Sequence, residues 1–253
     1  IEKLPRPMRK TLSPTARNPK EMIMPKLAIT TLREKYVYLT EEGGKKGNIA
    51  YFHGCAANYL ENGIGEAVIN VLTRNGIEPV LPRQRCSGTP ILTYGNKNIA
   101  MENAHFNLDS LLKYEKVITS CASCNLMLKE YIKYTEGEYQ EKAQKLHDRV
   151  YDISEFIFKE LKIVPPKGYK NKKRVTYHSS CHLRAAGVTK EPQNVLKNIP
   201  GVEFVEMRDS ERCAGGAGSF IIKNYEQSKQ IFWRKKRGIE ESKAEIVTTS
   251  CPA

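Results

Sequence analysis

The stretch KVITSCASC, residues 116–124, joins a short apolar run to two cysteines three positions apart. The run 116–119 predicts a strand, and residues 126–134 have the pattern of a helix. Cys121 and Cys124 therefore lie at the turn between the two elements. Two thiolates on one turn can bind one metal centre, and the N-terminus of the following helix stabilises their negative charge.

The same arrangement occurs twice along the chain, with three expected strands in each copy. Those of the first copy cover residues 48–53, 77–81 and 116–119, and those of the second cover 174–178, 202–207 and 245–249. The cysteines that follow them are Cys55, Cys86 and Cys121 in the first copy, and Cys181, Cys213 and Cys251 in the second. Matching cysteines are 126, 127 and 130 positions apart, and such a regular repeat indicates two homologous modules.

Helical patterns separate these strands, at 65–75 and 98–113 in the first copy and at 192–198 and 225–241 in the second. Strands that alternate with helices predict a parallel sheet in each module. Ligands of such sheets bind beyond the carboxyl ends of the strands, which is where the cysteines lie. We therefore expect an α/β fold of two tandem Rossmann-like modules, with the cysteines at the carboxyl ends of the strands.

The expected domain organisation has four parts. Residues 1–46 form a basic, Pro-rich arm or linker, with five of the thirteen prolines in the first 25 positions. The first cysteine-rich module covers 47–150 and a connector covers 151–170. The second module covers 171–253, and we expect it to be truncated, because the chain stops two residues after Cys251.

Composition and charge limit the class of protein. Of the 253 residues, 40% are hydrophobic and 27% charged, and there is no apolar stretch long enough to cross a bilayer and no secretory signal. Seven cysteines without such a signal indicate thiols in a reducing cytoplasm. The net charge of +13 favours an acidic protein face, anionic lipid or nucleic acid as partner, and a merely well-solvated surface is the alternative.

Four cysteines of the first module, Cys55, Cys86, Cys121 and Cys124, provide the number of ligands that a [4Fe–4S] cluster or a tetrahedral zinc requires. The pair Cys121 and Cys124 alone would also suit a thiol redox enzyme. Unconnected structural thiols are the remaining alternative. They would not be expected to recur at matched strand ends.

The motifs around these cysteines resemble those of the cysteine-rich CCG-domain family. They are His53-Gly54-Cys55, Arg85-Cys86-Ser87-Gly88, Ser120-Cys121-Ala122-Ser123-Cys124, Tyr177-His178-Ser179-Ser180-Cys181-His182-Leu183 and Cys213-Ala214-Gly215-Gly216-Ala217-Gly218. The family includes one subunit of heterodisulfide reductase and the iron–sulfur subunits of anaerobic glycerol-3-phosphate dehydrogenase, glycolate oxidase and lactate-utilisation complexes. The resemblance implies an electron-transfer subunit that works with a flavoprotein, with the basic arm as the linker after a ferredoxin-like domain.

Two positions depart from the family motif, which has adjacent cysteines before a glycine. Ser87 and Ala214 replace the second cysteine in the two repeats. In heterodisulfide reductase-like members both thiols belong to non-cubane clusters that cleave disulfides, so the departures argue for ordinary four-thiolate clusters or one degenerate site. We expect one [4Fe–4S] cluster in the first module. A second would use Cys181, Cys213 and Cys251, with a fourth ligand from His178, His182, solvent or residues beyond Ala253.

The expected function is that of an iron–sulfur subunit of an oxidoreductase complex, relaying electrons between a flavoprotein dehydrogenase and a quinone or other acceptor. No catalytic triad, acid/base carboxylate pair or nucleotide fingerprint is present in the sequence, so catalysis by the chain alone is not expected. A heterodisulfide reductase-like enzyme and a structural zinc scaffold are the alternatives. We expect a cytoplasmic protein, peripheral on the inner membrane face, that does not bind nucleic acid.

Four other features have two interpretations each. His53 and His178 could tune or bind a cluster, but a strand-end histidine bonded to backbone is the simpler expectation. Ser87 could be an oxygen ligand or cap a turn. The small residues 215–218, Gly-Gly-Ala-Gly, could form a phosphate-binding loop, but without the spacing and lysine of a P-loop they better suit a backbone passing close to a metal centre. Residues 233–237, Trp-Arg-Lys-Lys-Arg, could dock an acidic partner or form a solvated helix face.

Overall fold

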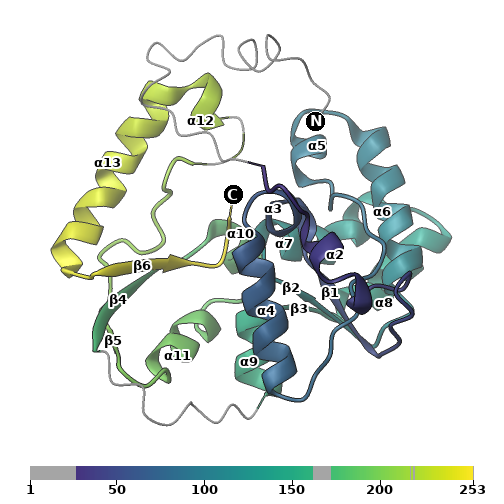
Figure 1. The fold of residues 1–253 in the computed structure, drawn as a ribbon. Helices are drawn as coiled ribbons and strands as arrows, with labels where there is room; N and C mark the ends of the chain where they lie inside the picture. Colours follow the sequence, from purple (N-terminus) through teal and green to yellow (C-terminus); the bar gives the residue numbers. More distant parts are fainter. Residues whose placement is uncertain (1–26, 162–171, 217, 219, 253) are drawn as a thin grey trace.

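The computed structural model describes residues 27–161, 172–216, 218 and 220–252. It contains two three-stranded parallel sheets, one from each half of the chain (Figure 1). This confirms the expected α/β fold with two Rossmann-like modules. Residues 1–26 of the expected arm and residues 162–170 of the expected connector lie outside the described residues.

The first sheet has the order β1-β2-β3, formed by β1 (Ile49–Phe52), β2 (Lys116–Thr119) and β3 (Val150–Asp152). The strand expected at 77–81 is reduced to two bridges, Val80 with Ala50 and Leu81 with Thr40. Prolines at 79 and 82 flank this pair. Proline has no N–H to donate to a sheet, so pairing stops there.

Helices cover both faces of the first sheet, because alternate strand residues point to opposite sides. Phe52 and Val117 pack with α6 (Lys97–Leu111), α7 (Ala122–Tyr134) and α8 (Glu138–His147). Tyr51 and Ile118 pack on the other face. The elements there are α2 (Leu32–Lys35), α4 (Asn62–Arg74) and α9 (Ile153–Glu160). The remaining helices of this module are α3 (Gly54–Tyr59), α5 (Thr89–Thr93) and the 3-10 helix η1 (Val37–Leu39).

Part of the expected arm belongs to the core of the first module. Leu32 of α2 is fully buried and Leu39 of η1 is 3% exposed. The amide of Leu81 also donates to the carbonyl of Leu39. Residues 31–40 are therefore packed on the first module, in contrast to an extended arm. Similarly, β3 and α9 continue the first sheet and its helical layer across the boundary that we had placed at residue 150.

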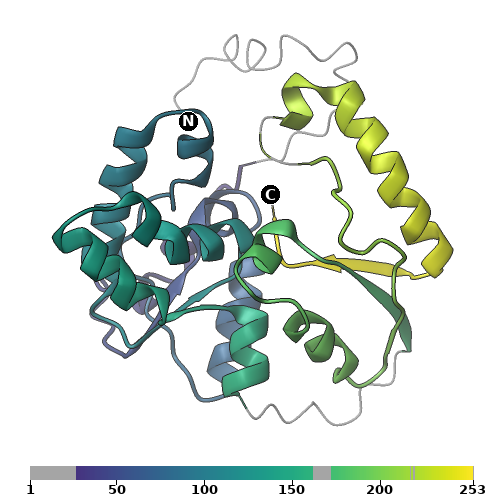
Figure 2. The same ribbon diagram turned by 180° about the vertical axis from the view of Figure 1, so that it is seen from behind.

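The second sheet has the order β5-β4-β6, formed by β4 (Lys173–His178), β5 (Val202–Phe204) and β6 (Ile246–Thr249). Here β4 takes the place of β1 and β6 that of β2. The helices of this module are α10 (Cys181–Ala185), α11 (Glu191–Lys197), α12 (Phe220–Lys223) and α13 (Tyr225–Ser242). Figure 2 shows α13 on the side of the second module that faces away from the first.

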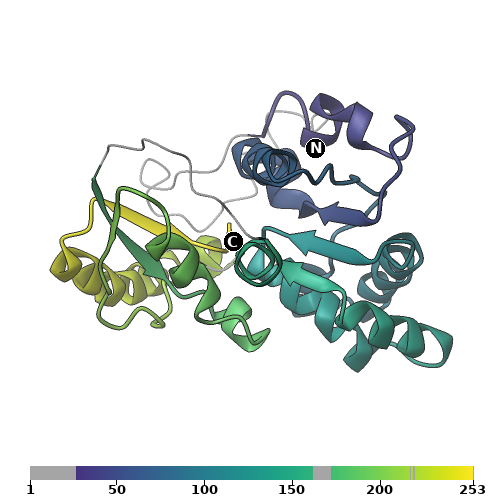
Figure 3. The ribbon, with the colours of Figure 1, turned by 90° about the horizontal axis from the view of Figure 1, so that it is seen from below.

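The two modules meet near the carboxyl ends of their strands. Helix α10 packs on α7, and α9 packs on α11. The last strand, β6, runs toward the first module, so the end of the described chain lies between the two sheets (Figure 3). No helix in the described ranges is long and apolar enough to cross a membrane.

Candidate metal centre

Cys55 and Cys86 lie close together at the carboxyl edge of the first sheet. Cys55 lies in α3, directly after β1, and Cys86 follows the bridged residues at 80 and 81. The Cys86 thiol donates to Cys55 and lowers the pKa of Cys55 to about 6. The same bond raises the pKa of Cys86. One thiolate is thus favoured at this edge, and it is held by a neighbouring thiol.

Cys121, Cys124 and Cys251 form a second group of contacting thiols. Cys121 is the N-cap of α7, and both it and Cys124 are buried. Hydrogen bonding with Cys124 and Cys251 raises the pKa of Cys121. Cys251 comes from the end of β6, so a cysteine of the second module joins those of the first. We call Cys55, Cys86, Cys121, Cys124 and Cys251 the thiol group.

Ser87 and Gly54 connect the two parts of the thiol group. The Ser87 hydroxyl donates to the Cys124 sulfur at 3.5 Å, so it neither caps a turn nor stands apart from the site. Gly54 has φ +67°, and a Cβ there would lie 3.0 Å from the Cys124 sulfur. Glycine is therefore required for the backbone to pass this close to the thiol. The Gly54 amide is fixed by donating to Gln84 at 3.0 Å.

A buried network holds the loop that carries Cys86. The Asn107 side chain accepts from the Arg85 amide at 2.8 Å and donates to the Tyr131 hydroxyl at 3.0 Å. Tyr131 in turn donates to the Ser87 carbonyl at 2.9 Å. Asn107 and Tyr131 are fully buried. Buried polar side chains that are bonded on several sides fix a single loop conformation.

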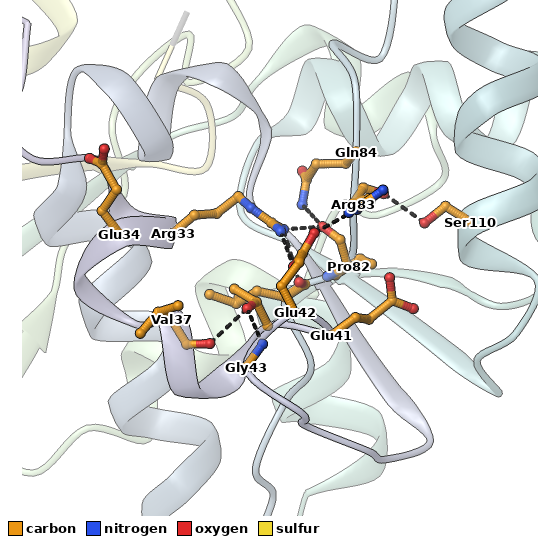
Figure 4. Close-up of polar contacts among 12 residues, drawn as sticks. Arg33, Glu34, Val37, Glu41, Glu42, Gly43, Pro82, Arg83, Gln84 and Ser110 are labelled. Atoms are coloured by element: carbon orange, nitrogen blue, oxygen red, sulfur yellow. Dashed lines mark hydrogen bonds and ion pairs between the residues drawn. The ribbon is translucent and has the colours of Figure 1, made fainter.

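The residues before this loop are held by the packed part of the arm (Figure 4). Arg33 of α2 donates to the Leu81 carbonyl at 2.9 Å and pairs with Glu42 at 2.8 Å. Arg83 binds the same carboxylate at 2.6 Å and, with Arg33, lowers the pKa of Glu42 to about 2. These contacts connect residues 33 and 42 to the segment that leads to Cys86.

A polar junction links the thiols of the two modules. Ser123 lies 2.7 Å from His182 Nδ1 and 3.5 Å from the Cys251 sulfur. A hydrogen bond to Cys251 raises the pKa of His182. The Ala122 amide also donates to the Ser250 carbonyl at 3.1 Å. Cys251 is thus fixed beside Cys121 by contacts from both modules.

Two predicted ligands lie outside the thiol group. Cys181 begins α10 and Cys213 follows β5, as the repeat predicts, but both are exposed. Cys213 accepts a hydrogen bond from the Gly215 amide at 3.3 Å. Gly215 itself permits close packing rather than approach to a metal, because a Cβ there would lie 2.6 Å from the Ser228 carbonyl of α13.

The histidines have different surroundings. His53 is buried and bonds the Gly54 carbonyl, and burial lowers the pKa of His53 to about 4. His178 bonds the Ser210 carbonyl at 3.1 Å. The simpler expectation, bonding to backbone, therefore holds for both. His182 is the histidine that contacts a thiol in the described residues.

The repeat contains a matched pair of hydrogen bonds that our sequence analysis missed. The Tyr51 hydroxyl lies 2.6 Å from Ser120 Oγ, and that of Tyr177 lies 3.1 Å from Ser250 Oγ. Each bond connects the first strand of a module to the residue before its last repeated cysteine. The offset between the repeats would have revealed this pair. No comparable signal marks Asn107, Tyr131 or Arg33, whose partners are distant in sequence.

The donor set of the thiol group fits an iron–sulfur cluster. Thiolate sulfur is the usual ligand of such clusters, and buried hydrogen bonds to sulfur tune them. In the described part of the chain, no three His, Cys, Asp or Glu side chains are grouped so as to hold a single metal ion. Each iron of a cluster takes its own thiolate, so the ligands of a cluster need not meet at one point.

Comparison with known proteins identifies both modules. The model of the cysteine-rich CCG domain matches residues 49–129 and again 175–253, together more than half of the chain. Lactate utilization protein A of Bacillus licheniformis is 31% identical over 203 residues, which cover 79% of this chain and 85% of that protein.

Two archaeal relatives are longer than the region they share with this chain. One subunit of the fumarate reductase (CoM/CoB) of Methanothermobacter marburgensis is 34% identical, over 81% of this chain and 40% of the relative. An uncharacterized iron–sulfur protein of Methanococcus maripaludis is 32% identical, over 85% of this chain and 41% of that protein. The repeated motifs, the paired sheets and these matches lead to one conclusion: the chain belongs to the cysteine-rich CCG-domain family and carries two copies of the domain.

Proposed function

We propose that the chain is an iron–sulfur electron-transfer subunit of an oxidoreductase complex. The observation that carries the proposal is the contact of Cys55 with Cys86 and of Cys121 with Cys124 and Cys251. In this proposal, Cys55, Cys86, Cys121 and Cys124 hold one [4Fe–4S] cluster. Two relatives support the same class of function: the fumarate reductase (CoM/CoB) subunit and the uncharacterized iron–sulfur protein.

A cluster bound by these thiolates would supply one-electron transfer. The chain's own residues hold and orient the thiolates, and they exclude water from Cys121 and Cys124. Burial of Cys121 and Cys124 lowers the local polarity. The Ser87 hydroxyl stabilises negative charge on the Cys124 sulfur. Both effects adjust a reduction potential, in opposite directions, because a less polar site disfavours the more negative state and a hydrogen bond favours it.

The second centre of the proposal uses Cys181, Cys213 and Cys251. His182 is a candidate for the fourth ligand, because it already contacts Cys251. Since Cys251 also contacts Cys121, the two centres adjoin at the junction of the modules. Electrons could then pass from one module to the other within the chain. A less complete ligand set at the second centre would make its metal easier to remove.

The proposed partners are a flavoprotein dehydrogenase and a quinone or other acceptor, with the chain on the cytoplasmic side and peripheral to the membrane. The names of two relatives, a lactate utilization protein and a subunit of a fumarate reductase, support a link to organic-acid metabolism. In this proposal the chain contributes to an enzyme as one of its subunits. The substrate is bound elsewhere in the complex.

A heterodisulfide reductase-like activity is the second candidate. Its support is the fumarate reductase (CoM/CoB) relative, together with the meeting of thiols from both modules. Ser87 and Ala214 argue against it, because they replace the second thiol of each motif. Robust reduction of a disulfide substrate by the isolated reconstituted protein would favour this candidate over the first.

The decisive test is the metal content of protein purified without oxygen. Iron and acid-labile sulfide are expected in roughly equal amounts, with about four of each per [4Fe–4S] cluster. Electron paramagnetic resonance of the reduced protein should show the cluster. Stoichiometric zinc without iron, in protein from iron-replete cells, would overturn the proposal and favour the structural zinc scaffold.

A further inference from the structure

Helix α13 is locked onto the loop that precedes Cys213. Lys235 is only 2% exposed, and its ammonium group donates to the carbonyls of Asp209 at 3.0 Å and Ser210 at 2.7 Å. At Gly238, a Cβ would lie 2.3 Å from the Arg208 carbonyl, so a larger residue would push the loop away. The helix and the loop at 207–212 therefore form one rigid unit.

This contact gathers four arginines around one cavity. Arg208 and Arg212 come from the loop, and Arg234 and Arg237 come from α13. With Asp209, Gly238 and Glu241 they line a cavity of about 240 Å³. Arg208 pairs with Glu241 at 3.3 Å and Arg212 with Asp209 at 3.1 Å. Arg234 and Arg237 are exposed and have no ion-pair partner among the residues that the structure describes.

The only tryptophan of the chain lies on the same helix. Trp233 is 54% exposed, and Phe232 beside it is 44% exposed. Trp233 and Arg237 are four positions apart, so they are neighbours on the helix surface. An exposed tryptophan next to arginines is typical of the centre of a protein interface, where both residue types are enriched.

We propose that α13 and the loop at 207–212 dock an acidic segment of a partner protein. Carboxylate side chains would enter the arginine-lined cavity and bind the free guanidinium groups of Arg234 and Arg237, which suit carboxylates in a two-pronged arrangement. An apolar residue of the partner would cover Trp233. We call Trp233, Arg234, Arg237, Arg208 and Arg212 the docking surface.

Two observations favour a protein segment over an anionic membrane. The arginines converge on a concave site, whereas a bilayer presents a flat surface. Asp209 and Glu241 also lie in the lining and would repel a continuous sheet of lipid phosphates, while separate carboxylate side chains can enter between them. Helix α13 lies on the side of the second module away from the first (Figures 1 and 2), so a partner could reach the helix without displacing the first module.

The docking surface adds a specific partner site to the proposed function. The loop at 207–212 leads directly to Cys213, so a partner bound there would lie beside a proposed ligand of the second centre. The inference that carboxylates bind there does not depend on which metal the thiols hold. Metal analysis and peptide binding therefore test the two proposals separately.

The experiment uses the whole protein and a synthetic peptide of eight glutamates with one central leucine. Emission of the single tryptophan reports binding directly, and a fluorescein label on the peptide gives an independent anisotropy signal. We expect saturable binding with a blue shift of Trp233 emission, and weaker binding as added salt shortens the screening length. The double variant R234E/R237E should weaken binding at least tenfold, because attraction becomes like-charge repulsion.

The matched control is R74E/K97E, which changes the same number of exposed charges on the first module. It should bind the peptide within about twofold of the unaltered protein, since its charges are remote from the cavity. Equal loss of binding in the two double variants would overturn the docking surface. So would tight binding to vesicles of equal parts phosphatidylglycerol and phosphatidylcholine without peptide binding. Unchanged metal content in both variants would show that the proposed centres remain intact.

Discussion

The two modules share an order of elements but differ in how they are covered. Val117 of β2 is fully buried, whereas Val247, at the matching position of β6, is 43% exposed. Strand β2 is covered because β3 pairs with its outer edge and because helices α7 and α9 pack on the sheet. No further strand pairs with β6 in the described residues. A repeated sequence thus produces the same strand and cysteine order twice, while burial depends on elements outside the repeat.

The cysteines differ in the same way. Cys55 and its counterpart Cys181 are both exposed, but Cys86 is half-buried where Cys213 is exposed, and Cys121 is buried where Cys251 is half-buried. Asn107, Tyr131 and the packed part of the arm fix the Cys86 loop. In the second module, Lys235 fixes the corresponding loop through backbone carbonyls. We therefore expect a tightly held first centre and a more labile second one.

The largest difference should appear in iron content. C121S should remove about four irons and weaken the second centre as well, because Cys121 contacts both Cys124 and Cys251. C181S should affect only the second centre, because its thiol lies outside the thiol group. Iron and acid-labile sulfide per chain, measured after anaerobic purification, check this. Identical losses in the two variants would remove the distinction between the modules.

The free energy of unfolding should depend on pH because of Asp152, which lies in β3 of the first sheet. Burial of Asp152 raises the pKa of its carboxyl to about 6. The folded state then holds a proton that the unfolded chain releases near pH 4, so the free energy of unfolding falls as pH rises from about 4 to 6. The loss is at most about 3 kcal/mol.

Urea titrations of the unaltered protein and D152N across this range check the sign. The variant keeps an oxygen to accept from the Ser154 amide, as Asp152 does at 2.9 Å, and should lose this part of the pH dependence. D148N, at an exposed aspartate of the same module, is the matched control and should retain it. A stability that rises from pH 4 to 6 relative to D152N would contradict the expected sign.

At the junction of the modules, a backbone amide of the first module donates to the second, but the equivalent residue of the second module cannot donate in return. Ala122 donates to the Ser250 carbonyl at 3.1 Å, but Pro252, which matches Ala122 in the repeat, has no N–H. A122P should leave the Ser250 carbonyl unpaired and cost about 1–3 kcal/mol of unfolding free energy. Proline itself suits the first position of α7, and the extended Cys121 (φ −136°, ψ 115°) suits a residue before proline.

Chemical unfolding of A122P and P252A measures this asymmetry. P252A is the matched control at the equivalent position. It removes no hydrogen bond, so we expect it to remain within about 0.5 kcal/mol of the unaltered protein. If A122P were as stable as the control, the bond would contribute nothing to the junction.

The smallest effect should come from the paired tyrosines. Y51F removes a 2.6 Å bond between two buried side chains, and Y177F removes a 3.1 Å bond from a buried tyrosine to the half-buried Ser250. Losses of about 0.5–1.5 kcal/mol are expected, with the larger loss for Y51F. Unfolding monitored by circular dichroism, with iron content as a control for the site, checks the order. A larger loss for Y177F would reverse the comparison between the modules.

Sequence reasoning predicted most of the repeated elements. The helix expected at 225–241 is α13 (Tyr225–Ser242), and the strand expected at 116–119 is β2. The helix is predicted by its long periodic pattern and the strand by its β-branched apolar residues. The expected strand at 77–81 failed, because its prolines limit pairing. The sequence does not predict β3 and α9, since they lie outside the repeat.

The sequence by itself determined the α/β class, the two-fold repeat and the placement of five cysteines after strands. These depend on local patterns and on a spacing that is visible along the chain. Only the tertiary structure decided that Cys251 lies beside Cys121, that Arg33 and Asn107 support the Cys86 loop, and that Lys235 is buried rather than available for docking. Each of these contacts joins residues at least 20 positions apart. Their meeting depends on how the sheets and helices pack, which no local pattern specifies.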